Sequence, residues 1–214
     1  QMKFSIAYQG IRGSYSESCA KENYPDCETI PCKTFDECFE IANSDPNIRA
    51  IIPESNKTTG NIGVEYLIFK YRLNIYAEHF YSIKHNLLVV PGAKFKEIKN
   101  VYSHAQALSQ SSQFIKKNNL NENVRADTAG SAKFVSEQKD KTNAAIASSL
   151  SAEIYGLSIL EKNIQDDQKN VTRFLIMGKN IFQPELKDKK YITSFLFKLK
   201  SKPAALYSAL SGFA

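Results

Sequence analysis

The chain lacks any apolar run long enough to cross a membrane, and it lacks the features of a secretory leader. Its first residues, Gln1-Met2-Lys3, lead directly into an apolar stretch that we interpret as a strand, without a signal-peptide core. Hydrophobic residues make up 43% and charged residues 23% of the 214 residues, which is ordinary for a folded globular protein. We therefore expect a soluble protein with a substantial core and no membrane partner.

Long basic blocks are also missing, although the formal net charge is +6 and the pI is about 9.0. Such a charge is compatible with an anionic partner, either a nucleic acid or a carboxylated metabolite. The basic clusters, Lys116-Lys117 and Lys187-Asp188-Lys189-Lys190, are short, and the sequence has no zinc-finger spacing or aromatic RNA-binding signature. A solvated basic surface explains this charge better, so we expect no nucleic-acid partner.

The chain has little cysteine, and what it has is confined to the first 40 residues: Cys19, Cys27, Cys32 and Cys38. These positions form no C-x-x-C pair, and the three histidines are not spaced to complete a zinc site. A disulfide set is expected only in an oxidising compartment. We therefore expect reduced, partly buried thiols and no metal.

Short apolar runs alternate with segments of helical period up to about residue 160. The runs predict strands at residues 4–8, 28–31, 50–53, 75–79, 87–90, 101–103, 124–126, 144–147 and 174–177. The periodic segments predict helices at residues 15–22, 35–42, 64–71, 106–117, 130–137 and 152–155. This alternation is typical of βαβ units, so the expected fold class is α/β with mainly parallel sheets.

Capping-box spacings mark several of the joints between strands and helices. They occur at Ser14 with Glu17, Thr34 with Glu37 and Ser103 with Gln106, while Thr128 is the expected cap of the helix after residues 124–126. At any single joint, helix capping alone explains the hydroxyl, because it satisfies free backbone N–H groups. Several such joints at the carboxyl ends of strands indicate a binding edge, and helix N-termini favour anions. The pattern therefore predicts a small anionic ligand.

A dense polar run at residues 163–174 interrupts the apolar pattern and is placed like a functional loop. Residues 66–91 include a long, nearly helix-free apolar stretch that we interpret as one crossing between two lobes, with residues 165–174 as the return. This predicts one lobe from residues 1–78 with 175–190, a second from residues 79–174, and a cleft between them. A third unit, residues 191–214, contains an expected strand at 193–199 and a helix at 203–214, too little to close a core.

Several separated motifs, which follow one another over nearly the whole chain, resemble those of the prephenate dehydratase family. In their particular residues they resemble the plant-type arogenate dehydratases. The motifs are Tyr8-Gln9-Gly10 through Gly13-Ser14-Tyr15-Ser16-Glu17, Ser103-His104-Ala105-Gln106-Ala107-Leu108, Asp127-Thr128-Ala129-Gly130-Ser131-Ala132, Ala144-Ala145-Ile146-Ala147-Ser148, and Ile164-Gln165-Asp166-Asp167 with Asn170-Val171-Thr172-Arg173-Phe174. The resemblance implies a two-lobed fold like that of type II periplasmic binding proteins. An α+β ACT regulatory domain would follow, and residues 191–214 would be the N-terminal part of a truncated one.

The activity implied by the resemblance is the coupled loss of water and carbon dioxide in L-phenylalanine biosynthesis. The substrate would be a small dicarboxylate, either prephenate, which gives phenylpyruvate, or arogenate, which gives phenylalanine. The family implies no metal or organic cofactor, and a homo-oligomer where the ACT domain is complete. A location in the cytoplasm or the plastid stroma is expected, and no targeting segment is recognised in the sequence.

Site residues carry over from the family's motifs position by position. Thr172 is the implied catalytic residue, whose hydroxyl would donate to the departing ring hydroxyl, and His85 matches a family position that we interpret as structural. Two further residues are assigned to catalysis and five to substrate binding: Asn56 and Gln110, then Ser14, Ser55, Ser103, Thr128 and Arg173. For Arg173 two interpretations stay open, a bond to a substrate carboxylate or a structural salt bridge.

One motif departs from the family, because Pro53-Glu54-Ser55-Asn56-Lys57 stands where Pro-x-Glu-Asn-Ser is usual. The change replaces an acceptor carboxylate with the hydroxyl of Ser55 and adds the cation of Lys57. Binding could persist while turnover falls, since only interactions that strengthen in the transition state raise the rate. The alternative function is therefore a catalytically weakened paralogue that binds a small carboxylated ligand or a protein partner. A solute-binding protein of the same fold is disfavoured, because it would not need the Thr172 motif.

Overall fold

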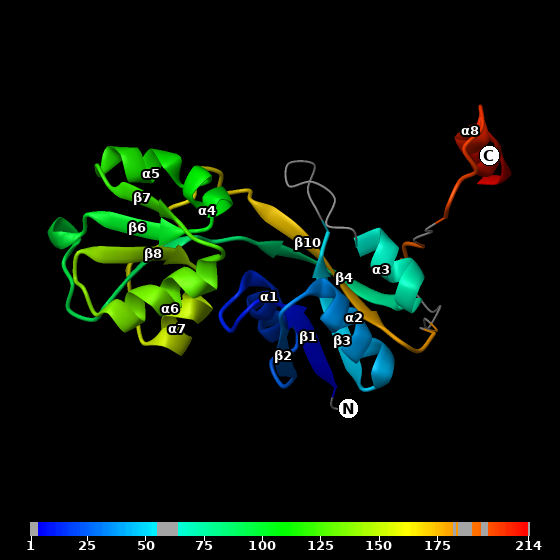
Figure 1. Cartoon of the computed structure of the whole chain (residues 1–214), viewed down its shortest axis with the longest axis horizontal. Helices are drawn as coiled ribbons and strands as arrows, with labels where there is room; N and C mark the ends of the chain where they lie inside the picture. Colours follow the sequence, from blue (N-terminus) through cyan, green and yellow to red (C-terminus); the bar gives the residue numbers. More distant parts are fainter. Residues whose placement is uncertain (1–3, 55–63, 182, 184–189, 194–196, 214) are drawn as a thin grey trace. The chain divides into compact units, whose positions relative to one another are not determined.

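The computed structural model describes residues 4–54, 64–181, 183, 190–193 and 197–213 (Figure 1). The chain divides into two units, Gln1–Phe182 and Gln183–Ala214. Within the described part of the first unit there are two five-stranded sheets and the helices that cover them. The described part of the second unit contains the helix α8 (Ala205–Leu210) and the short 3-10 helix η2 (Ser211–Phe213), and none of its described residues is buried.

The first sheet has the order β2-β1-β3-β10-β4. Its strands are β1 (Ser5–Gln9), β2 (Glu28–Cys32), β3 (Ile48–Pro53), β4 (Asn74–Ser82) and β10 (Val171–Gly178). β1 pairs in parallel with β2 and β3, whereas β10 pairs antiparallel with both β3 and β4. The accompanying helices are α1 (Tyr15–Asn23), α2 (Phe35–Ser44) and α3 (Val64–Tyr71).

Both faces of the first sheet are packed, because successive side chains of a strand point to opposite faces. Ile6, Tyr8 and Ile51 pack with Cys19 and other residues of α1 on one face. The intervening strand residues pack on the other face with α2 and α3: Ala7, Ala50 and Ile52 against Phe39 and Leu67. The strands are accordingly apolar at consecutive positions rather than at alternate ones, as is usual for strands buried on both sides.

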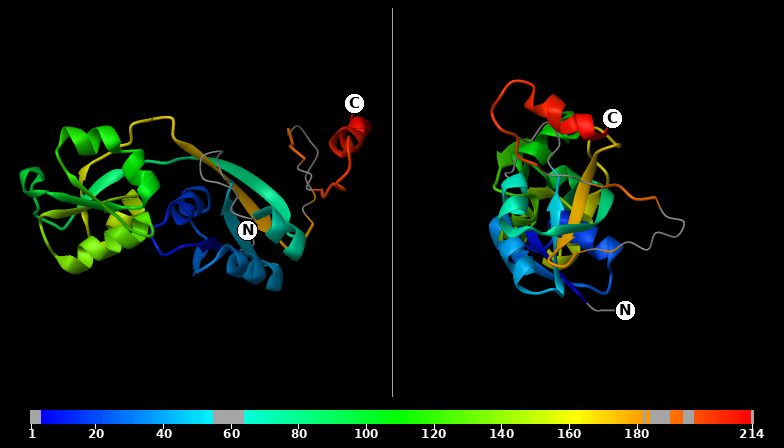
Figure 2. Two further views of the ribbon diagram at one scale, coloured as in Figure 1. Left: turned by 45° about the horizontal axis from the view of Figure 1, so that its top comes forward. Right: turned by 90° about the vertical axis from the view of Figure 1, so that its right-hand side faces the viewer.

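The second sheet has the order β7-β6-β8-β5-β9. Its strands are β5 (Asn86–Val89), β6 (Asn100–Ser103), β7 (Asn121–Val124), β8 (Asn143–Ala147) and β9 (Ser158–Glu161), and η1 (Phe95–Glu97) precedes β6. Its helices are α4 (Ala105–Ser109), α5 (Ser112–Lys117), α6 (Thr128–Gln138) and α7 (Ser149–Tyr155). α4 and α5 lie on one side of the sheet and α6 and α7 on the other (Figure 2), as right-handed crossovers in opposite directions require.

Two adjacent segments connect the sheets. β4 and β10 pair along their whole lengths, from Ser82 opposite Val171 to Asn74 opposite Gly178. The pairing continues one step beyond the strands, where the N–H of Ile83 donates to the carbonyl of Asn170 over 2.8 Å. Figure 1 shows the two strands side by side as they leave the first sheet toward the second. The outgoing and returning chains therefore form one paired ribbon.

The predicted α/β class with two sheets is confirmed, but the expectation of mainly parallel sheets is wrong. Each sheet has two parallel and two antiparallel pairs of neighbouring strands. All four antiparallel pairs involve either β5, the first strand of the second sheet, or β10, the strand that returns to the first sheet. The short strand β9 has no predicted counterpart, since its apolar run is only the two residues Ile159 and Leu160.

Helix starts agree with the sequence at two joints and differ at two. The side chains of Ser14 and Thr34 cap α1 and α2, as expected. Thr128 is not the cap of α6, because the carboxylate of Asp127, one residue earlier, accepts the N–H of Gly130. Ser103 is not the cap of α4 either. Its hydroxyl donates to the carbonyl of Ile146 within the sheet, and His104 takes the cap position.

The helix expected at residues 106–117 is divided into α4 and α5. The break is explained by Asp166, whose carboxylate accepts the N–H of Gln113 and the hydroxyl of Ser112. A carboxylate from another segment thus supplies the cap of α5, which the α5 cap residue Ser111 does not provide with its own side chain.

Three further expectations concern smaller features. All four cysteines are free and buried, which confirms the predicted thiols. Among the described residues, no helix is long and apolar enough to cross a membrane. In the second unit, residues 191–193 and 197–200 form no strand where one was expected at 193–199, and residues 194–196 lie outside the described set.

Gly13 lies where the β1–α1 joint of the first sheet contacts α7 of the second. Its carbonyl accepts hydrogen bonds from the hydroxyls of Ser148, over 2.6 Å, and Ser151, over 2.8 Å. Its φ is +93°, and a Cβ at this position would lie 3.0 Å from the Cα of Ser151 and closer still to its hydroxyl oxygen. Only glycine meets both conditions without displacement.

We therefore expect Gly13→Ala to lower the free energy of unfolding by about 3 kcal/mol, because left-handed strain and overpacking add. Gly156→Ala is the matched control. Its φ is +64° with open space around the Cβ, so it should cost only about 1 kcal/mol. Urea unfolding measures both. Equal effects in the two variants would show that the contact with Ser151 does not matter.

Candidate active site

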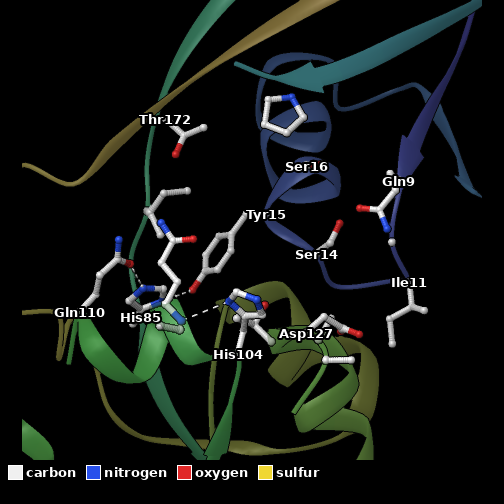
Figure 3. Close-up of a pocket in the computed structure, with 18 of the residues that line it drawn as sticks. Gln9, Ile11, Ser14, Tyr15, Ser16, His85, His104, Gln110, Asp127 and Thr172 are labelled. Atoms are coloured by element: carbon white, nitrogen blue, oxygen red, sulfur yellow. Dashed lines mark hydrogen bonds between the residues drawn. The ribbon is translucent and has the colours of Figure 1, made fainter. Parts of the chain in front are cut away.

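A pocket of about 460 Å³ lies between the two sheets of the first unit (Figure 3). It is lined from the first sheet by the β1–α1 joint and the start of β10, and from the second by the starts of α4 and α6. The two connecting segments contribute His85 and Asn170. The described walls of the pocket therefore belong to helix ends, strand ends and the connections between the sheets.

The N-termini of α1 and α6 face this pocket. Ser14, Tyr15 and Ser16 at the start of α1 and Thr128 and Ala129 of α6 are all in its lining. The first N–H groups of a helix have no partner within the helix, and the helix dipole places positive potential there. The cap of α1 is the neutral Ser14, whereas the cap of α6 is the carboxylate of Asp127. The first turn of α1 also holds a carboxylate, that of the buried Glu17, which accepts the N–H of Gly13 over 2.7 Å. Both helix ends therefore offer N–H groups to an anion, each beside one carboxylate.

Thr172 and Arg173 lie on opposite faces of β10. Thr172 lines the pocket, and Figure 3 shows its side chain above Tyr15 and Gln110. Arg173 points the other way, as the two-residue period of a strand requires. Its Nη1 and Nε donate to Glu54 and Glu78, each over 2.7 Å, and the hydrogen bond to Glu54 contributes most to raising the pKa of Arg173. Of the two interpretations of Arg173, the structural salt bridge is the one formed.

Gln110 lines the pocket as the third member of a chain of four side chains, in the order Tyr15, His85, Gln110 and Asn170. Its Oε1 accepts the amide N–H of Asn170 over 3.0 Å and lies 2.8 Å from Nε2 of His85. Nδ1 of His85 lies 2.6 Å from the hydroxyl of Tyr15. His85 is 2% exposed, and this burial lowers the pKa of its imidazole, while burial raises the pKa of Tyr15. At neutral pH both side chains are therefore uncharged.

The polar run at residues 163–174 is fastened to this chain at its beginning. Gln165 accepts the N–H of His85 over 2.9 Å, and the N–H of Asp166 donates to the carbonyl of Gln110 over 2.7 Å. The carboxylate of Asp166 caps α5, as described above. The run is thus tied to the connection that contains His85 and to α4 and α5 before it enters β10, which fixes the approach of Thr172.

Four of the residues assigned to the site from the sequence line the pocket together: Ser14, Gln110, Thr128 and Thr172. Ser103 and Arg173 are not in the lining, since Ser103 is fully buried in its sheet and Arg173 is held by two carboxylates. Ser55 and Asn56 lie outside the described residues.

Several lining residues were not assigned from the sequence, and most stand beside one that was. Tyr15 follows Ser14, Asp127 precedes Thr128, and Asn170 comes two residues before Thr172. Their inclusion follows from the motif once the joint or strand is placed. His104, at the start of α4, has its Nδ1 taken up by the N–H of Gln106. Among the described residues, no group of three or more histidine, cysteine, aspartate or glutamate side chains is arranged to hold a metal ion.

The sequence is similar to proteins named as dehydratases. A family model described as prephenate dehydratase matches residues 6–181. A protein of Petunia hybrida named arogenate dehydratase 2 is 42% identical over 213 residues, which cover 99% of this chain and 54% of the relative. An Arabidopsis thaliana protein named arogenate dehydratase/prephenate dehydratase 2, chloroplastic, is 40% identical, covering 98% and 55% respectively. The chain therefore spans about half the length of these curated relatives.

Solved structures resemble the fold over most of its length. The structure of a prephenate dehydratase in complex with L-Phe from Arthrobacter aurescens has a TM-score of 0.82 at 22% identity, covering 98% of this chain and 71% of that one. A structure of GqqA, described as a novel type of quorum quenching acylase, also has a TM-score of 0.82, at 30% identity, covering 97% and 76%. With the family model matching most of the sequence, the chain belongs to the prephenate dehydratase family.

Proposed function

We propose that the protein is a dehydratase that removes water and carbon dioxide together from prephenate or arogenate, in the biosynthesis of L-phenylalanine. The observation that carries the proposal is the position of Thr172, whose motif is the most specific of the family resemblance. It lies in one pocket with Gln110 and the N-terminus of α1. A hydrogen-bond donor for a leaving hydroxyl is thereby combined with donors for carboxylates.

The proposed reaction breaks two bonds of the substrate ring. The carbon–carbon bond to the ring carboxylate breaks, and its electron pair enters the ring as carbon dioxide departs. The carbon–oxygen bond of the ring hydroxyl breaks at the opposite end, and the departing oxygen takes up a proton to become water. Aromatisation supplies much of the driving force, so the protein needs mainly to hold the carboxylates and to assist the leaving hydroxyl.

In this proposal the Thr172 hydroxyl donates its hydrogen bond to the departing oxygen. An alcohol is a weak acid, so stabilisation of developing charge in the transition state contributes more than complete proton transfer. The first-turn N–H groups of α1 bind a carboxylate, because they face the pocket and have no partner within the helix. Gln110 supports the same ligand from the second sheet. Holding the substrate at fixed points on both sheets also lowers the entropic cost of reaction.

We also propose the finer features that the family resemblance implies. The two sheets correspond to two lobes, expected at residues 1–78 with 175–190 and at residues 79–174; the strand ends favour placing the exchanges after Ser82 and before Val171. Residues 191–214 would begin an ACT domain, with a homo-oligomer as the assembly of the complete protein. A plastid location is supported by the chloroplastic relatives, with the cytoplasm as the alternative.

The proposal is tested by incubating the purified chain with each substrate and following phenylpyruvate or phenylalanine. We expect turnover of at least one. Thr172→Ala should lower kcat by about 10²-fold or more while unfolding like the parent, because it removes the hydroxyl and one methyl group of a half-buried side chain. Thr172→Ser removes only the methyl group and should retain most of the activity. Product from neither substrate would refute the proposal, and near-parental activity of Thr172→Ala would refute the role of that hydroxyl. A third assay uses an acyl amide as the substrate, because the similar structure of GqqA is described as that of an acylase.

A second candidate is a catalytically weakened paralogue that binds a small carboxylated ligand or a protein partner. It is favoured by one observation, the replacement of the usual acceptor and hydroxyl of the family motif by Ser55 and Lys57.

This candidate predicts that the double variant Ser55→Glu with Lys57→Ser has a kcat/KM at least tenfold above that of the parent, because it restores the acceptor carboxylate and removes a cation. Steady-state kinetics on both substrates measures the change. The control is Lys84→Ser, which removes an exposed cation from another loop. If the double variant is no faster than the parent, Ser55 and Lys57 do not explain any weak activity of the chain.

A further inference from the structure

The chain of four side chains that includes Gln110 joins four separate segments of the pocket wall. Tyr15 belongs to α1, His85 to the outgoing connection, Gln110 to the end of α4, and Asn170 to the returning connection. Figure 3 shows Tyr15 and Gln110 on either side of the His85 ring. Neither ring nitrogen of His85 is left over, so each must act as either a donor or an acceptor in a fixed order.

The order is set by the single proton of the Tyr15 hydroxyl. This hydroxyl lies 2.6 Å from Nδ1 of His85 and 3.1 Å from the carbonyl of Lys84. Hydroxyl donors bond over about 2.5–3.0 Å and N–H donors over about 2.7–3.2 Å, so the shorter contact fits an O–H donor and the proton lies toward Nδ1. Nδ1 is then an acceptor, and a neutral imidazole carries its hydrogen on Nε2. Nε2 donates to Oε1 of Gln110.

The orientation of the Gln110 amide follows from that donor. Its Oε1 accepts from both His85 and Asn170, which uses both lone pairs of the oxygen. The amide nitrogen, with two hydrogens, is the atom left for the pocket. In the opposite arrangement Tyr15 donates to the carbonyl of Lys84, and His85 carries its hydrogen on Nδ1. The amides of Gln110 and Asn170 then have their oxygen and nitrogen exchanged. This arrangement puts the Tyr15 proton in the long 3.1 Å contact, makes the 2.6 Å contact an N–H···O bond shorter than is usual, and presents an acceptor to the ligand.

We infer that His85 is a positioning residue whose Nε2–H holds the Gln110 amide with its NH₂ group toward the pocket. The inference rests on the proposed function for what that group binds. An NH₂ group is a donor, as a carboxylate or a leaving oxygen requires, whereas a turned amide would place an oxygen against the anion. His85 itself need not touch the substrate, since both of its ring nitrogens are already bonded to protein groups.

The hydrogen position on His85 is tested first, on the unliganded chain, by ¹⁵N NMR of the histidine rings. His85→Gln identifies the resonances that belong to residue 85. We expect the neutral ring with hydrogen on Nε2 at pH 7. Hydrogen on Nδ1, or a charged ring, overturns the inference whatever the enzyme does. The result is independent of whether prephenate or arogenate is the substrate.

Kinetics then test the consequence with two substitutions of opposite character. His85→Gln can place an amide NH₂ near the position of Nε2 and keep the donor to Gln110. His85→Asn can place an oxygen near the position of Nδ1 and loses that donor. We expect His85→Asn to lower kcat/KM at least tenfold and His85→Gln to stay within about threefold of the parent, with similar thermal unfolding. Equal losses in both variants would indicate a packing role and refute positioning.

The matched control lies elsewhere in the same unit. His79 forms a similar pair with Tyr24, in which Nε2 lies 2.9 Å from the hydroxyl and the ring centroids are 5.4 Å apart, compared with 5.5 Å for Tyr15 and His85. It does not line the pocket. His79→Asn should therefore leave kcat/KM unchanged. If the parent itself turns over neither substrate, the proposed function fails and the NMR result alone decides the hydrogen position.

Discussion

The pairing of β4 with β10 is the constraint on which the rest of the molecule depends. It joins the segment that leaves the first sheet to the segment that returns, along eight residues of β10. Because the last bond of the pair lies between Ile83 and Asn170, the two connections reach the second sheet side by side. His85 and Asn170 can then meet the same residue, Gln110, from two directions.

The pocket that results is polar without a concentration of cations. Its described lining contains no lysine or arginine, and Arg173, which the motif places beside Thr172, is bonded to two glutamates on the other face of the sheet. Positive potential comes instead from helix ends and from oriented N–H groups. Such donors are fixed by the backbone and by buried partners, so they need little rearrangement when an anion binds. The overall charge of +6 therefore has no direct part in the pocket described here.

The sequence allowed the α/β class, most strand positions and four of the pocket residues to be predicted, because each depends on a local pattern. Thr172 and Arg173 could not be separated in the same way, since the expected strand began at Phe174 and β10 begins at Val171. The sequence around Ser103 predicts a helix cap. The hydrogen bond that its hydroxyl makes instead, to the carbonyl of Ile146, depends on how the strands of the sheet pair. The network at His85 joins positions 15, 85, 110 and 170, which lie too far apart in the sequence for any local pattern to connect them.

The first sheet is assembled from two distant stretches of the chain, whereas every strand of the second lies between Asn86 and Glu161. During synthesis from the N-terminus, all strands of the second sheet therefore emerge before β10 does. Until then β4 has no neighbour in the first sheet, because its partner there is β10. Thr172 arrives with the strand that completes the sheet. Completion of the first sheet and assembly of the candidate pocket are consequently one event, and a nascent chain that stops short of β10 carries the pocket's other walls without its threonine.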